Sequence, residues 1–181
     1  MMNKEPVVEP VKLIAGFIYA SEEALVSVLE KMENAHGPVE SESEHFPFTH
    51  TDYYDREMGP ELRRCFISFE PPIAPDMLRE CKLAAVGLEK KYLNADGGRM
   101  VNIDPGLIGL SNLVLASTKA FAHRVYLGKG IYGEVSMLYE DREFVPLRWT
   151  YPDYRQEEAT RFFLQVRERL KEQIGTLRQS G

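Results

Sequence analysis

The chain has 181 residues, of which 44% are hydrophobic and 28% are charged, which fits one globular domain with a core of useful size. Its net charge of −6 disfavours nucleic acid as a partner, because neutralising phosphates needs a clustered basic surface. The sequence holds neither a signal peptide nor about 18 apolar residues in a row, so we expect a soluble cytoplasmic protein without membrane contact.

The first elements predicted along the chain are a strand, a helix and a second strand. The apolar run 11–20 is typical of a buried strand, and Ser21 with two following glutamates favours a helix start. Gly37 and Pro38 are expected to end that helix. Weak alternation at 39–46 indicates the next strand, which leads into the long aromatic loop FPFTHTDYYDREMG.

The following segment repeats the order strand, helix, strand. Residues 64–70 alternate as a strand should, with Cys65, Ile67 and Phe69 on one face. Pro75 suits the first position of a helix that runs to about Leu93, whose apolar stripe comprises Met77, Cys81, Ala84, Leu88 and Tyr92. Residues 99–103 are predicted to form a strand, and the whole order is typical of the split βαβ unit of ferredoxin-like domains.

The second half of the chain predicts short strands joined by tight turns, at residues 113–117, 122–127, 131–139 and 143–147. An amphipathic helix follows at 157–174. We therefore expect an α+β fold, in which a ferredoxin-like split βαβ unit is extended by an antiparallel β-meander and a C-terminal helix. The chain 1–181 is expected to be a single globular domain, with an extended arm at 1–10 and a polar tail at 175–181.

The motif NIDPG is predicted to form a turn after the strand that ends at Ile103. Proline and glycine favour the turn, and the Asp104 carboxylate can brace its own loop backbone. Because binding sites favour loops that rigid elements hold in place, metal or substrate binding by Asp104 is the alternative interpretation.

The motif TKAFAHRVYLGKG carries Lys119, His123, Arg124 and Lys129 within one short segment. An arginine can bind a phosphate or carboxylate through two N–H groups, and a lysine adds a point charge. In a strand, His123 and Arg124 would point to opposite faces, so the two need not converge. The alternative interpretation is a set of surface cations with one half-buried histidine.

Two acidic side chains complete the candidate set. Glu134 in IYGEVS faces either water or a cleft on the far side of the sheet. Asp153 in TYPDY is favoured as the cap of the last helix, and a lid is the alternative. The sequence does not bring the polar residues of the earlier loop to the same place, namely Asp52, Tyr53, Tyr54, Glu57, Arg63 and Arg64.

Several familiar mechanisms lack their motifs in this chain. It contains no GxxxxGK[ST], no GxGxxG after a strand, no HExxH and no GxSxG. His45 and His50 are five positions apart, on different sides of a strand or helix, which makes them a weak zinc pair. The spacing of Cys65 and Cys81 indicates reduced, buried thiols rather than a disulfide.

Five segments in this order resemble the bacterial domain of unknown function family 4416: PVKLIAGFIYA in part, FPFTHTDYYDREMG, NIDPG, STKAFAHRVYLGKGIYGEV and TYPDY. The likeness covers nearly the whole chain and implies a soluble cytoplasmic protein without an established activity. The family pattern usually has a tyrosine after the glycine of NIDPG and a threonine after the glutamate of IYGEV. This chain has Leu107 and Ser136 there, which weakens a catalytic role for those two hydroxyl positions.

Our leading hypothesis is binding, with turnover left open, of a small phosphorylated or carboxylated ligand such as a nucleotide. The candidate residues are His123 as proton carrier, Lys119, Arg124, Lys129 and Tyr126 for the ligand, and Asp104 with Glu134 for a divalent metal. The alternative is an RNA- or protein-interaction module without catalytic activity. The sequence does not indicate a reaction, a cofactor beyond that possible metal, or an oligomeric state.

Overall fold

The structure is a computed structural model that describes residues 8–179. Its strands are β1 Val11–Tyr19, β2 Val39–Glu42, β3 Phe46–Pro47, β4 Arg63–Ile73, β5 Val101–Ile108, β6 Asn112–Ser117, β7 Val125–Gly128, β8 Ile131–Glu140 and β9 Glu143–Pro146. Its α-helices are α1 Glu22–His36, α2 Asp55–Met58, α3 Leu78–Glu89 and α4 Glu157–Gln179. Short 3₁₀ turns occupy Pro75–Met77 and Pro152–Arg155.

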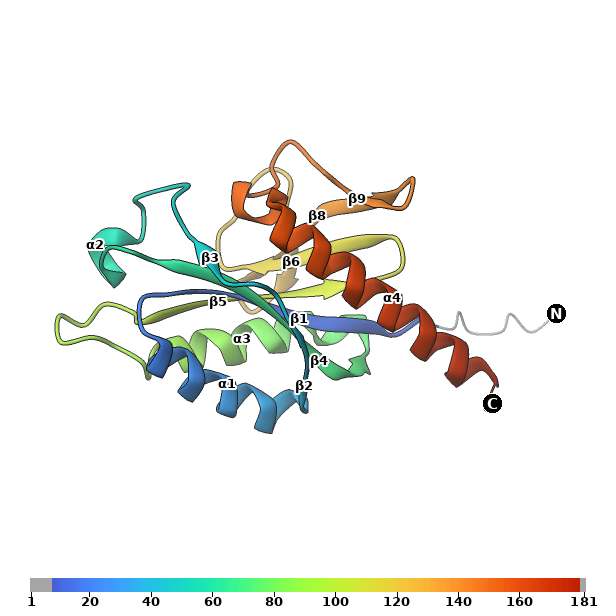
Figure 1. Cartoon of the computed structure of the whole chain (residues 1–181), viewed down its shortest axis with the longest axis horizontal. Coiled ribbons are helices and arrows are strands. Elements are labelled where there is room, and N and C mark those ends of the chain that lie inside the picture. Colours follow the sequence, from blue (N-terminus) through green and yellow to red (C-terminus); the bar gives the residue numbers. More distant parts are fainter. Residues whose placement is uncertain (1–7, 180–181) are drawn as a thin grey trace.

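All nine strands pair antiparallel in one sheet, which confirms the α+β prediction. The order is β2-β4-β1-β5-β6-β8-β7, with β3 beside β4 and β9 beside β8. Helices α1 and α3 cover one face of the sheet, and α4 crosses the other (Figure 1). The assignment of the first half to the ferredoxin-like fold stays a prediction.

The second half differs from the predicted meander in one pairing. Strand β6 pairs with β8 and not with β7, and both β7 and β9 lie along the other edge of β8. The two predicted hairpin turns are present. Gly128, Lys129 and Gly130 all have positive φ, as do Asp141 and Arg142, which is the conformation that tight hairpins require.

Local sequence signals set both ends of α1. The Ser21 side chain accepts a hydrogen bond from the Ala24 backbone N–H, and Gly37 ends α1 with a φ of 95°. Helix α3 starts at Leu78 and ends at Glu89, which is shorter than predicted. Helix α4 continues to Gln179 through most of the predicted tail, whereas residues 1–7 of the predicted arm lie outside the described residues.

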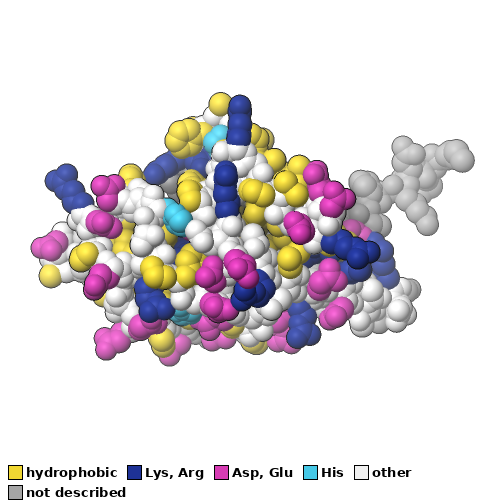
Figure 2. Space-filling view, turned by 45° about the horizontal axis from the view of Figure 1, so that its top comes forward, with side chains coloured by type: hydrophobic (Ala, Val, Ile, Leu, Met, Phe, Trp, Pro, Cys, Tyr) yellow, Lys and Arg dark blue, Asp and Glu magenta, His cyan; other side chains and the backbone are white. Residues whose placement is uncertain are grey.

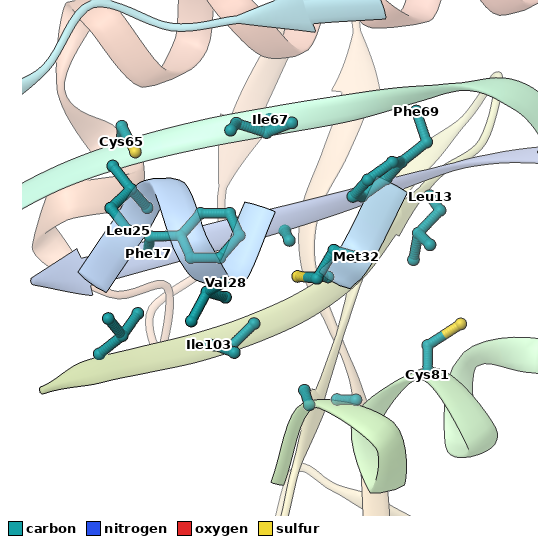
Figure 3. Close-up of a cluster of buried hydrophobic side chains, with 14 of the residues drawn as sticks. Leu13, Phe17, Leu25, Val28, Met32, Cys65, Ile67, Phe69, Cys81 and Ile103 are labelled. Atoms are coloured by element: carbon teal, nitrogen blue, oxygen red, sulfur yellow. The ribbon is translucent and has the colours of Figure 1, made fainter. Parts of the chain in front are cut away.

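Alternating residues of β1 build two cores. Leu13, Ala15, Phe17 and Tyr19 pack with α1 and α3, and Figure 3 shows this cluster between the sheet and the helices. Ile14 points the other way and packs against α4. Within residues 8–179, no helix has the length and apolar character needed to span a membrane.

NIDPG lies inside β5 and does not form the predicted turn. Strand β6 pairs with β5 only from Gly106 onward, so the part of β5 before Gly106 has a free edge on the side of β6. Two side chains of α3 take the place of a neighbouring strand there. The Ile103 N–H donates to Glu89 Oε1 at 2.7 Å, and Lys82 Nζ donates to the Ile103 carbonyl at 2.7 Å.

Candidate functional site

A cavity of about 360 Å³ lies where β5 and β6 separate, and we call it the fork cavity. Its charged lining residues are Arg64, Asp104, Lys119, Arg124, Glu134 and Asp153. The aromatic residues Phe48, Tyr53, Tyr54, Tyr151 and Tyr154 supply much of the remaining wall. The segments 48–54 and 151–154 are thus brought to one place by the fold, although a hundred residues separate them.

The floor of the fork cavity is Arg64, whose side chain is only 1% exposed. Its Nε lies 2.9 Å from Asp153 Oδ2, and its Nη1 donates to Asp104 Oδ2 at 3.4 Å. The guanidinium also stacks 4.6 Å from the ring centre of Phe66. A Cβ at Gly16 would lie 2.9 Å from Arg64 Nη2, so the glycine leaves room for this side chain.

This arrangement corrects the prediction for Asp153. The carboxylate is buried and pairs with Arg64 instead of capping α4, which begins four residues later at Glu157. A buried charge requires a partner, and that requirement outweighs the capping preference of aspartate.

Asp104 is held between two cations. Lys82 Nζ lies 3.4 Å from Oδ1, and Asn102 Nδ2 donates to Oδ2 at 2.8 Å beside Arg64. Burial alone would raise the pKa of Asp104, but Lys82 and Arg64 hold the pKa below its usual value. Lys82 reaches this carboxylate past the free edge of β5, from the α3 side of the sheet.

Glu134 brings together the two residues that strand alternation would separate. Residues 123 and 124 lie in the turn before β7 and not in a strand, so both side chains reach the same oxygen. Arg124 Nε donates to Glu134 Oε2 at 2.6 Å, and His123 Nε2 lies 2.9 Å from it. Ser136 Oγ donates to Oε1 at 3.2 Å, and the carboxylate is buried.

Arg124 also fixes the wall of the fork cavity. Its Nη1 donates to Ser117 Oγ and to the Lys119 carbonyl, and its Nη2 donates to the Tyr151 hydroxyl at 2.8 Å. Most of its N–H groups are therefore occupied by the protein itself. Lys119 differs, because its Nζ donates to the Tyr53 hydroxyl at 3.1 Å and has no carboxylate within ion-pair distance among residues 8–179.

Three predicted site residues lie outside the fork cavity. His123 stacks on Trp149 with ring centres 4.9 Å apart and lines a second cavity, which Glu134 also borders. Lys129 sits in the β7–β8 turn and pairs with Glu80 at 3.2 Å. Tyr126 is 59% exposed on β7 and its hydroxyl accepts from the Gly130 N–H.

The metal prediction for Asp104 and Glu134 is not tested by this geometry. Among the described residues, the group of three potential metal ligands is formed by Glu42, His45 and Cys65, and it includes neither carboxylate. Both of them contact cationic side chains instead.

Sequence reasoning missed the central role of Arg64 and Tyr154. One signal was present, because Arg64 lies at the start of the alternating strand and shares a face with Phe66, while Gly16 interrupts an apolar run on the neighbouring strand. Nothing in the sequence indicates that Lys82 and Glu89 of α3 are buried, since charged residues on a helix are usually exposed.

Acidic, basic and hydrophobic side chains are interspersed over the face shown in Figure 2. The local charge around the fork cavity differs from the negative net charge of the whole chain. The charged lining residues balance, with Arg64, Lys119 and Arg124 against the carboxylates of Asp104, Glu134 and Asp153.

The family described as "Domain of unknown function (DUF4416)" matches residues 9–170 of the chain. Comparisons with curated proteins and with solved structures gave no significant match.

Proposed function

The chain belongs to the family of domain of unknown function 4416, and we propose that its fork cavity binds a small phosphorylated or carboxylated ligand that carries a ring, such as a nucleotide. The volume of about 360 Å³ is within the range of cavities that hold small molecules. The aromatic walls suit a flat ring, and the cations suit an anionic group.

The observation that carries this proposal is the incomplete hydrogen bonding of the buried Arg64 side chain and its neighbour Tyr154. Its guanidinium is buried at the cavity floor, and its Nη2 donates no hydrogen bond to any residue between 8 and 179. The neighbouring Tyr154 hydroxyl is also buried and has no hydrogen-bond partner within that part of the chain. A buried donor without a partner is costly, so an acceptor supplied by a ligand would stabilise the Tyr154 hydroxyl, and it could also accept from Arg64 Nη2.

The protonated Tyr154 hydroxyl and the position of Lys119 support an anion as well. Burial raises the pKa of Tyr154 well above its usual value, so its hydroxyl stays protonated and can donate. Lys119 adds a positive charge at the exposed side of the cavity without a carboxylate of its own.

The roles of His123 and Arg124 follow from their positions. Arg124 positions the wall, because its N–H groups hold Glu134, Ser117 and Tyr151. His123 remains the candidate proton carrier, and it would act on a ligand in the fork cavity only through Glu134. We therefore propose ligand binding and assign no reaction.

The test uses thermal unfolding with inorganic phosphate, adenosine, adenosine monophosphate and citrate as probes. We expect at least one anionic probe to raise Tm in a concentration-dependent way, because a ligand that binds only the folded state stabilises it. Lys119→Ala should weaken the binding of that probe about tenfold, since it removes one charge-assisted hydrogen bond to the ligand.

The matched control is Lys129→Ala, which removes an exposed lysine outside the fork cavity and should bind the probe as the wild type does. The proposal is wrong if no anionic probe shifts Tm. It is also wrong if the two lysine variants lose affinity equally, because that result indicates a general charge effect.

A protein-interaction function is the second candidate, and one observation favours it. Strand β7 is an edge of the sheet and exposes Val125 and Tyr126, which are 69% and 59% exposed. An edge strand with apolar side chains can add a strand from another protein. A stable complex with a second protein, together with no response to small anions, would favour this function over the fork cavity.

A further inference from the structure

We propose that Glu42, His45 and Cys65 form a binding site for a zinc ion, separate from the fork cavity. The carboxylate oxygen, the imidazole nitrogen and the thiol sulfur lie within 4.8 Å of one another. This mixture of O, N and S donors is the set that Zn²⁺ prefers in proteins.

A break between two strands brings these side chains together. Residues i and i+3 of a regular strand point to opposite faces, so Glu42 and His45 would normally diverge. Here β2 ends at Glu42. The Ser43 N–H donates to the Phe66 carbonyl of β4 at 2.8 Å, and the Ser43 hydroxyl accepts from the Phe66 N–H at 2.9 Å. The chain turns at this point and directs both side chains toward Cys65.

The surroundings of His45 resemble those of a metal-binding histidine. The Tyr19 hydroxyl lies 2.5 Å from His45 Nδ1 and 3.1 Å from Glu22 Oε1. When Tyr19 donates to Glu22, the imidazole must donate from Nδ1, and its Nε2 lone pair then faces Glu42 Oε1 at 2.7 Å. A proton joins these two atoms when no metal is bound, and a metal ion that binds there would replace it. Metal-bound histidines commonly have such a partner on the other nitrogen.

The burial of the three ligands suits metal binding from solvent. Cys65 is fully buried at the end of the core that Figure 3 shows, whereas the side chains of His45 and Glu42 are 23% and 45% exposed. A zinc ion can therefore approach from the exposed side and keep one coordination position for a group from solvent.

Binding of the metal must displace the thiol proton. Burial raises the pKa of Cys65 to about 12, so the sulfur is protonated before the metal binds. The Zn–S bond forms as the S–H bond breaks, and the proton leaves to solvent.

The test is a titration of the full chain with Co²⁺ under reducing conditions, followed by displacement with Zn²⁺. We expect one ion per chain and a thiolate-to-cobalt charge-transfer band that Zn²⁺ abolishes. Cys65→Ser should remove the band, and His45→Gln should weaken binding at least about tenfold. Tyr19→Phe should weaken it by about 10- to 100-fold, because it removes the partner of Nδ1.

The matched control is Cys81→Ser, since Cys81 is the other buried thiol of the same core and does not belong to the group of potential metal ligands found among the described residues. It should keep both the band and the affinity. The proposal is overturned if the wild type gives no band with excess Co²⁺. A His45→Gln variant that binds as the wild type does would overturn it equally, even where Cys65→Ser fails to fold.

Discussion

At the scale of single residues, the fork cavity depends on buried charges that neutralise one another. Arg64 faces both Asp104 and Asp153, and Asp104 in turn faces Lys82. Breaking such a network by removing one partner destabilises a protein, because the remaining charge stays buried. Sequence patterns rank these residues as surface charges, so only the assembled sheet shows their pairing.

The first prediction concerns Asp104→Asn. The pKa of Asp104 is lowered in the folded protein, so the unfolded chain takes up a proton at a higher pH than the folded one. The stability that the carboxylate contributes is therefore fully present above about pH 4 and is lost as pH falls through the folded pKa. At neutral pH the variant should be less stable by about 2 kcal/mol.

Thermal unfolding of both proteins between about pH 7 and pH 3 checks this prediction. The difference in Tm should shrink toward the acid end. Asp96→Asn, in an exposed turn, is the control and should show no such trend. A difference that stays constant down to the lowest pH would contradict the assignment.

At the scale of elements, the separation of β5 from β6 creates the cavity. The pairing ends at Gly106, where the two strands approach closely. Beyond that point α3 supplies Lys82 and Glu89 to the free edge of β5. Of the apolar stripe predicted for this helix, Cys81 is buried and Leu88 and Tyr92 pack against the core, whereas Ala84 is exposed. Met77 of that stripe is 45% exposed and lies in the 3₁₀ turn before α3.

The second prediction concerns Gly106→Ala. An added Cβ would lie 2.6 Å from Leu115 Cδ2 and 3.0 Å from the Val114 carbonyl oxygen. The strands would have to move apart, at a cost of about 1–3 kcal/mol. Gly87→Ala is the matched control, because Gly87 is exposed in α3 with nothing within 4 Å of an added Cβ.

Chemical denaturation measures both variants. The control should gain up to about 1 kcal/mol, since alanine favours a helix more than glycine does. If Gly106→Ala were as stable as the wild type, the close approach of β5 and β6 would not be the constraint proposed here.

At the scale of the whole molecule, two cores on opposite faces of one sheet hold the site together. The face under α4 contains an aromatic cluster in which Phe163 packs against Phe66, Tyr154 and Phe144. Tyr154 belongs to this cluster and also lines the fork cavity. The packing of α4 thus fixes one wall of a cavity whose other residues come from distant strands.

The third prediction concerns Phe163→Ala. The side chain is fully buried, so its removal should cost about 3–5 kcal/mol. Leu177→Ala truncates an apolar residue of the same helix that is 58% exposed, and it should change stability by less than about 0.5 kcal/mol. Equal effects of the two variants in denaturant unfolding would show that α4 does not anchor this face.

The sequence by itself determined the elements and several of their ends, because strand alternation, Ser21 as a cap and Gly37 as a stop are local signals. It also indicated the region of the polar residues and the resemblance to the family. Tertiary structure alone decided which of them meet. NIDPG became strand because α3 satisfies its edge, and His123 joined Arg124 at Glu134 because a turn replaced the expected strand. Pairings between residues far apart in the chain depend on sheet order, which local propensity does not encode.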